Sequence, residues 1–222
     1  MKKTIKQPII AADIVIFTIE KGELKVLLVK RTKKPFKDHW ALPGGFLLEN
    51  ESPEEAALRV LKEKAGISNI YMEQLYTFPG SDRDPRGNVI TISYFALAPK
   101  DKTKIIQSEK TQTPTFYPIR KSPRLAFDHK KIIDYALKRL QSKLEYTNVV
   151  YSLLPRFFTF NQLQNAYEII LGKKLDKRNF RKKFMVLGLI KSTKKLHKGN
   201  RQRPAKLYQF VSKKPVELKK FF

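Results

Sequence analysis

Residues 44–67 read GGFLLENESPEEAALRVLKEKAGI, a glycine pair followed by a stretch with marked helix ends. Ser52 is a suitable N-cap, Pro53 suits the first helical position, and Glu55 completes a capping box. Gly66 stands where a left-handed residue closes a helix. Gly44 and Gly45 allow a sharp turn and a close approach of the backbone to a ligand. We therefore predict a helix from Pro53 to just before Gly66, placed behind a ligand-binding loop.

Stretches with the composition of strands surround this helix. Residues 11–32 predict a hairpin that turns at Gly22, and residues 88–99 and 115–120 predict further strands. An apolar stripe (Ala57, Leu58, Leu61, Ala65) gives the helix one face to bury. Repeated βαβ units and a GxGxxG motif are lacking, which argues against a Rossmann domain. The pattern predicts a mostly antiparallel α/β (α+β) sandwich.

The same stretch resembles the Nudix family, whose box reads G-x5-E-x7-R-E-U-x-E-E-x-G-U, where U is bulky and apolar. Seven of the nine specified positions match, and WALPGG (40–45) precedes them. The matches are Gly45, Glu51, Arg59, Leu61, Glu63, Gly66 and Ile67. The resemblance implies an α/β/α Nudix sandwich and a site for pyrophosphate chemistry. Two positions that carry Glu in the family carry Val60 and Lys64 here.

These two departures bear on metal binding. Residues 60, 63 and 64 share one helix face, and Mg²⁺ prefers several hard oxygen ligands. Of the three, only Glu63 is a carboxylate, and Glu51 is the remaining candidate metal ligand. We therefore expect pyrophosphatase activity to be lost or very weak. No cofactor is expected, with Mg²⁺ needed only if hydrolysis remains.

A charged turn, SDRDPRG (81–87), adds two arginines that could bind phosphate. The alternative is a solvated turn whose charges pair with one another. Similar turns occur in Nudix proteins that handle ADP-ribose, which favours a place at the pocket edge. The predicted ligand-binding residues are Arg31, Gly44, Gly45, Arg59, Glu63, Arg83 and Arg86.

The net charge of +26 is unevenly distributed over the 222 residues. Residues 1–145 hold 27 Lys/Arg and 17 Asp/Glu, whereas residues 146–222 hold 19 and 3. Such asymmetry indicates nucleic-acid binding, although a Lys-rich proteome would give part of the excess. Cysteine is absent, which excludes disulfides and thiolate sites. No apolar run approaches the roughly 20 residues of a membrane helix, so we expect a cytoplasmic protein without membrane contact.

The basic half has the pattern of a winged helix-turn-helix. We expect a helix over 129–144 with Asp128 as its cap, a short helix over 147–154, and a helix from Thr159 or Asn161 to Ile170. A second, basic helix over 176–187 and two strands (189–194, 206–211) complete the pattern. Its second helix would enter the major groove, and its wing would contact the backbone. The predicted DNA-binding residues are Lys177, Arg178, Asn179, Arg181, Lys182, Lys198, Arg201 and Arg203. The alternative is a basic, solvated face on a small helical domain.

Over residues 8–211 the chain resembles the Nudix-related transcriptional regulators (NrtR), most clearly at LAFDH (125–129), KLEYT (143–147) and LDKRNFRKK (175–183). The resemblance implies a Nudix-like sensing domain (1–145) and a winged helix domain (146–222). It also implies a homodimeric regulator, most often a repressor, that binds operator DNA of NAD-metabolism genes and responds to ADP-ribose or a related metabolite. A sister group senses a sugar, arabinose. An active pyrophosphatase with a basic tail and a non-catalytic RNA-binding module are the rival hypotheses.

Overall fold

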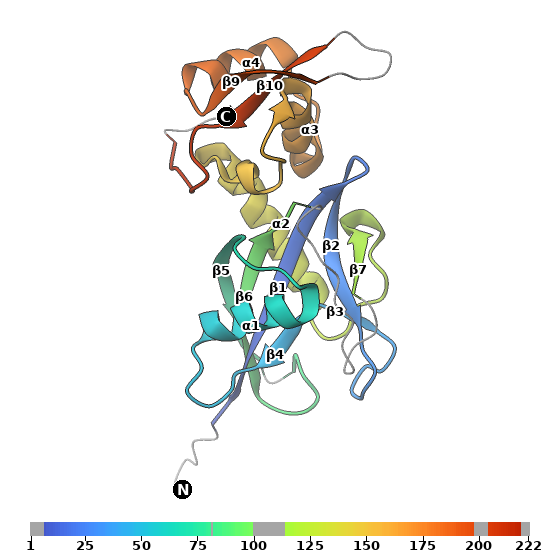
Figure 1. The fold of residues 1–222 in the computed structure, drawn as a ribbon. Helices are drawn as coiled ribbons and strands as arrows, with labels where there is room; N and C mark the ends of the chain where they lie inside the picture. The colour runs from blue at the N-terminus through green and yellow to red at the C-terminus, as the bar shows by residue number, and fades with distance from the viewer. Residues whose placement is uncertain (1–6, 81, 100–113, 198–203, 219–222) are drawn as a thin grey trace, which may run out of the picture. The chain divides into compact units, whose positions relative to one another are not determined.

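A computed structural model describes residues 7–80, 82–99, 114–197 and 204–218 (Figure 1). The chain divides into two compact units, one of residues 1–18 and 25–136 and the other of residues 19–24 and 137–222. The division falls inside helix α2 (His129–Tyr146), which continues through it. The boundary predicted after residue 145 stays a prediction.

The first unit is built on a seven-stranded mixed sheet in which β3, β2, β1, β6 and β5 lie in that order. In addition, strand β4 pairs with β1, and strand β7 pairs with β2. The bounds are β1 Ile9–Glu20, β2 Glu23–Lys30, β3 Trp40–Ala41, β4 Gly44–Phe46, β5 Tyr71–Phe78, β6 Val89–Leu97 and β7 Thr115–Pro118. The central strands β1 and β6 run parallel, from Ile9 opposite Val89 to Phe17 opposite Leu97. The predicted hairpin is confirmed, and its turn places Gly22 at a φ of 77°.

Helix α1 (Pro53–Ala65) and the first part of α2, up to Ala136, lie on opposite faces of this sheet in Figure 1. The face toward α1 is an apolar cluster in which Ile14 and Ile16 of β1 meet Val60 and Leu61 of the helix. Alternation along β1 directs Val15 and Phe17, also buried, to the other face. The predicted α/β/α sandwich is thereby confirmed.

The ends of α1 agree with the prediction. Ser52 and Glu55 form the reciprocal capping box, and Gly66 takes a left-handed conformation with φ 63°. Helix α2 begins at His129 as expected, and the carboxylate of Asp128, the predicted cap, accepts hydrogen bonds from Arg83. Strand β5 was not predicted.

The second unit contains α3 (Phe160–Leu171), α4 (Lys177–Val186) and a three-stranded sheet. Its strands β8 (Phe158–Thr159), β10 (Ala205–Phe210) and β9 (Ile190–His197) lie in that order. Thr159 caps α3 with Gln162, and Asp176 caps α4. The prediction of a helix over residues 147–154 was wrong in extent and type. The structure has a short 3-10 helix, Val149–Ser152, before Pro155.

Aromatic rings form the core between α3 and α4. Phe160, Tyr167, Phe180 and Phe184 are all buried and contact one another edge-on or tilted. Packing at this point holds the two helices as a helix-turn-helix, and β9 and β10 form the wing. Among the described residues, no helix has the length and apolar character required to cross a membrane.

Candidate functional site

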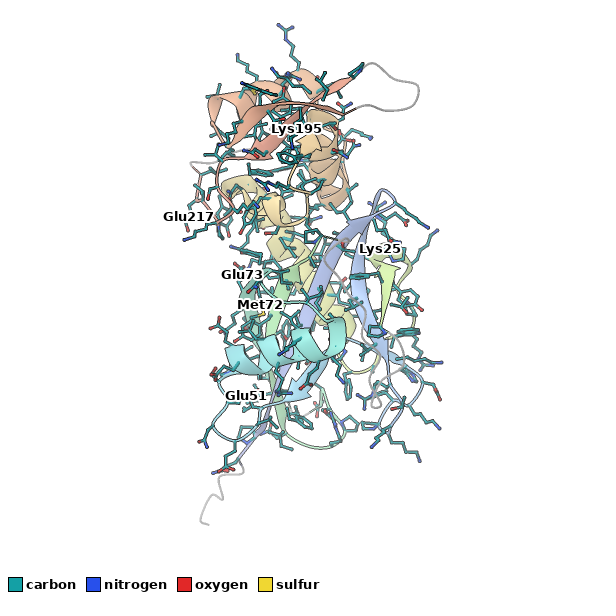
Figure 2. All side chains as sticks on the ribbon, in the orientation of Figure 1. Lys25, Glu51, Met72, Glu73, Lys195 and Glu217 are labelled. Atoms are coloured by element: carbon teal, nitrogen blue, oxygen red, sulfur yellow. The ribbon has the colours of Figure 1, made fainter. Side chains whose placement is uncertain are left out.

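The loop before α1 is fastened to the helix by one ion pair. Arg59 Nε and Nη2 donate to the two carboxylate oxygens of Glu51 at 2.7 and 2.8 Å, and Nη2 also donates to the carbonyl of Phe46. Hydrogen bonds from Arg59 and from the backbone of Leu48 lower the pKa of Glu51 to about 2. Glu51, labelled beside α1 in Figure 2, is therefore an anion held by an arginine.

The candidate metal ligands do not form a cage for a divalent cation. Val60 is buried in the apolar cluster beneath α1, so it offers that face no oxygen. Glu51 is bound to Arg59, and Glu63 Oε2 lies 3.8 Å from Nη1 of the same arginine. The described residues contain no group of three or more acidic, His or Cys side chains placed to hold a metal. This donor set does not fit Mg²⁺, which requires several oxygens at one point.

A cavity of about 250 Å³ lies beside the glycine pair, and Lys64 is the residue of α1 that lines it. Five of the seven predicted ligand-binding residues line it: Arg31, Gly44, Gly45, Arg83 and Arg86. Arg59 and Glu63 do not line it, whereas Lys64 does. An adjoining cavity of about 540 Å³ shares Arg83, Asp84 and Phe127 with the first. Together they fall within the size range of small-molecule sites.

Arg83 is fixed at the back of this cavity by two carboxylates. Its side chain is 6% exposed, and Nη2 lies 2.8 Å from Asp128 and 3.4 Å from Asp13. Asp13 also explains Gly44, because a Cβ at that position would collide with the Asp13 carboxylate. Arg83, which was predicted to bind phosphate, thus also connects β1 to the start of α2 through ion pairs.

Arg31 and Arg86 form a cationic wall on the ring of Phe127. Their guanidinium carbons lie 4.8 and 5.5 Å from its centroid, and Arg86 also lies 4.9 Å from the Phe46 ring. Arg86 forms a bidentate pair with buried Asp84, so the turn is self-paired and at the pocket edge at once. Burial and the charge of Arg86 lower the pKa of Arg31. An anion placed here would relieve that repulsion.

His129 is a lining residue that the sequence did not indicate as a ligand contact. Its Nδ1 accepts a hydrogen bond of 2.8 Å from the backbone N–H of Leu42, so that nitrogen carries no proton. Burial lowers the pKa of His129, which makes it a neutral side chain at pH 7. Asp13, Phe127 and Lys64 were also missed. The sequence signal for Asp13 was a charge inside a buried apolar strand, which normally requires a partner.

The basic residues of α4 are exposed, whereas Phe180 and Phe184 of the same helix are buried. The exposed, predicted DNA-binding residues there are Lys177, Arg178, Asn179, Arg181 and Lys182. Arg181 differs from the rest, because it donates to the hydroxyl of Tyr208 and stacks on Phe160. Lys198, Arg201 and Arg203 of the predicted wing lie outside the described residues.

Comparison with known proteins defines the class first. Residues 8–136 match the NUDIX domain, and residues 150–210 match the NrtR DNA-binding winged helix domain. The chain is thus a Nudix protein that carries a winged helix, and it belongs to the NrtR family.

Similar proteins cover either nearly the whole chain or its Nudix part. An Acinetobacter baylyi protein described as "ADPR responsive transcriptional repressor NtrR" is 39% identical over 214 residues, which cover 95% of this chain and 85% of that protein. The crystal structure of Shewanella oneidensis NrtR complexed with a 27mer DNA has a TM-score of 0.81 and 37% identity, covering 90% of this chain and 93% of that one. The NUDIX domain of the same NrtR complexed with ADP ribose has a TM-score of 0.56 and 39% identity, covering 61% and 90%.

Proposed function

We propose that this chain is a transcriptional repressor that binds operator DNA through its winged helix and responds to ADP-ribose bound by its Nudix domain. It acts in the cytoplasm as a homodimer on a palindromic site, since two-fold proteins match two half-sites. The resemblance to NrtR proteins implies that its targets are genes of NAD metabolism. The Acinetobacter relative and the two Shewanella complexes support this proposal.

One combination of features carries the proposal. The same chain joins a cationic pocket without a carboxylate cage to a helix-turn-helix whose second helix exposes Lys and Arg. A pocket that binds without cleaving is what a sensor requires, because hydrolysis would destroy its signal. A ligand that binds one domain arrangement more tightly than another then changes DNA affinity.

The composition of the pocket favours a nucleotide over a sugar as effector. Arg31, Arg83 and Arg86 line one cavity of about 250 Å³, and guanidinium groups match phosphate oxygens in bidentate geometry. An uncharged sugar can accept hydrogen bonds from these arginines but forms no ion pair with them. Titration calorimetry with ADP-ribose and with arabinose tests the choice. Binding of arabinose alone would assign this chain to the sugar-sensing regulators.

An active pyrophosphatase is the enzymatic alternative, and the donor set speaks against it. Glu51 and Glu63 both face Arg59, and Val60 is buried among apolar side chains. We expect no release of AMP from ADP-ribose with Mg²⁺ or Mn²⁺. Turnover near the roughly 1 s⁻¹ of working enzymes would assign the chain to the hydrolases.

Duplex DNA, and not RNA, is the proposed nucleic acid. Fragments of the source chromosome are selected on the full-length protein, and the recovered site is then challenged with duplex and single-stranded RNA at several salt concentrations. Sequence-specific retention of DNA above the salt-sensitive background supports the proposal. Equal competition by RNA would favour the RNA-binding alternative.

A further inference from the structure

Two of the three carboxylate positions on the metal-facing side of α1 carry other residues in this chain. Val60 is 1% exposed and packs with Ile14 and Tyr94. Glu63 is turned to the surface, with its side chain 53% exposed. Lys64, half-buried, lies one turn after Val60 and lines the cavity together with the three arginines. The helix face that supplies carboxylates in a hydrolase therefore supplies one ammonium group.

The charges along the cavity wall indicate what that ammonium does. The lining holds four cations and two carboxylates, Asp13 and Asp84. Arg83 and Arg86 each pair with one or more carboxylates. The lining therefore holds more cations than carboxylates, and Asp128, outside the lining, also pairs with Arg83. A diphosphate diester carries a negative charge on each phosphate, which such a lining would attract.

We propose that the Lys64 ammonium takes the place of the divalent cation of Nudix hydrolases, so that the pocket binds the diphosphate of its effector without metal. This inference rests on the proposed function, because it assumes that the effector contains a diphosphate. Lysine suits the role, since its ammonium is a compact charge with three donors on a flexible stem. The same charge repels a divalent cation. Lysine at position 64 thereby retains the electrostatic part of phosphate binding, and together with Val60 it removes two of the carboxylates that would hold a metal.

The test measures binding of ADP-ribose and of inorganic pyrophosphate to the full-length protein, each in EDTA and in Mg²⁺. The variants are Lys64→Gln, Lys64→Arg and, as a matched control, Lys62→Gln. Lys62 carries the same charge on the same helix but is exposed and does not line the cavity. Thermal denaturation of each variant confirms that it is folded.

Three results are expected together. The unsubstituted protein has the same Kd in EDTA and in Mg²⁺. Lys64→Gln weakens binding roughly tenfold or more, the loss of a charged hydrogen bond, whereas Lys64→Arg retains most of the affinity. Lys62→Gln binds like the unsubstituted protein, which separates the pocket from the general basic surface.

The outcomes separate this inference from the proposed function. Binding that requires Mg²⁺, or equal affinities of Lys64→Gln and Lys62→Gln for ADP-ribose, overturns the role of Lys64 and leaves the proposed effector in place. Metal-free, Lys64-dependent binding of pyrophosphate without any binding of ADP-ribose upholds the role of Lys64 and overturns the proposed effector. Failure of both ligands to bind overturns both.

Discussion

Arg83 and Lys130 both pair with aspartates at the start of α2, but burial gives the two pairs different weight. The Arg83 side chain is 6% exposed between Asp13 and Asp128. Lys130 and Asp134 are 60% and 47% exposed. Exposed pairs contribute at most about 1 kcal/mol, whereas removing one partner of a buried pair leaves an uncompensated charge.

We therefore predict that Arg83→Gln lowers the free energy of unfolding by roughly 3–5 kcal/mol, because two carboxylates lose their partner. The midpoint of thermal denaturation should fall by roughly 10 °C. Lys130→Gln is the control and should change it little. Equal midpoints for the two variants would show that the ion pairs of Arg83 do not stabilise the fold.

The Glu51–Arg59 pair makes a prediction about pH. The pKa of Glu51, about 2, lies below its ordinary value of 4.5, so folding stabilises the ionised form of this carboxyl group. A carboxyl group whose pKa is lowered by folding contributes its full stabilisation above the pKa of the unfolded chain. That contribution is lost as the pH falls toward the pKa of the folded protein. Melting curves of the unsubstituted protein and Glu51→Gln should differ at pH 7 and converge between about pH 4.5 and 2. A difference that stays constant over that range would contradict the ion pair.

At the scale of elements, helix α4 carries both residues that pack against the domain and residues that are exposed to solvent. Arg181 contacts Phe160 and Tyr208, so its loss would disturb the domain as well as DNA contacts. Arg178 is exposed on the helix that follows the turn. It is therefore the cleaner probe of the predicted recognition helix.

Arg178→Gln should weaken binding to the selected operator roughly 5–150-fold, as expected for loss of a bidentate base contact worth about 1–3 kcal/mol. ADP-ribose binding should not change. Lys138→Gln removes a charge at an exposed position of α2 and is the control. Fluorescence anisotropy with labelled operator measures both, and unchanged affinity of Arg178→Gln would refute the assignment of α4.

The elements predicted correctly from the sequence are those that a few neighbouring residues determine. The caps of α1 and α3 and the Gly22 turn are each set by a few adjacent residues. Strand β5 was missed because its alternation is interrupted by a bulge between Gln74 and Tyr76, and only Leu75 and Phe78 are buried. A local pattern gives no signal where pairing with a distant strand decides the conformation.

Only part of the candidate pocket was predicted, because the rest of it depends on contacts between distant segments. Its glycines and arginines belong to recognisable motifs, whereas the roles of Asp13, Phe127 and His129 depend on contacts between distant segments. Arg59 was predicted as a ligand contact, but the structure places it on Glu51. Its assignment to the effector stays a prediction.

At the scale of the whole molecule, a repressor of this kind requires that ligand binding in one part of the chain change DNA binding in another. The chain combines a cationic Nudix pocket, with no cluster of metal-ligating side chains among the described residues, and a basic winged helix. Thermodynamic linkage requires that if ADP-ribose lowers affinity for DNA, then DNA lowers affinity for ADP-ribose by the same factor.

The most direct test is the affinity of the full-length protein for its operator duplex, measured at fixed salt with and without saturating ADP-ribose. The proposal predicts that ADP-ribose weakens operator binding roughly 5–150-fold, the range of typical coupling energies. It also predicts the reciprocal loss of ADP-ribose affinity in the DNA complex. Equal operator affinity in both conditions, with ADP-ribose shown to be bound, would contradict it.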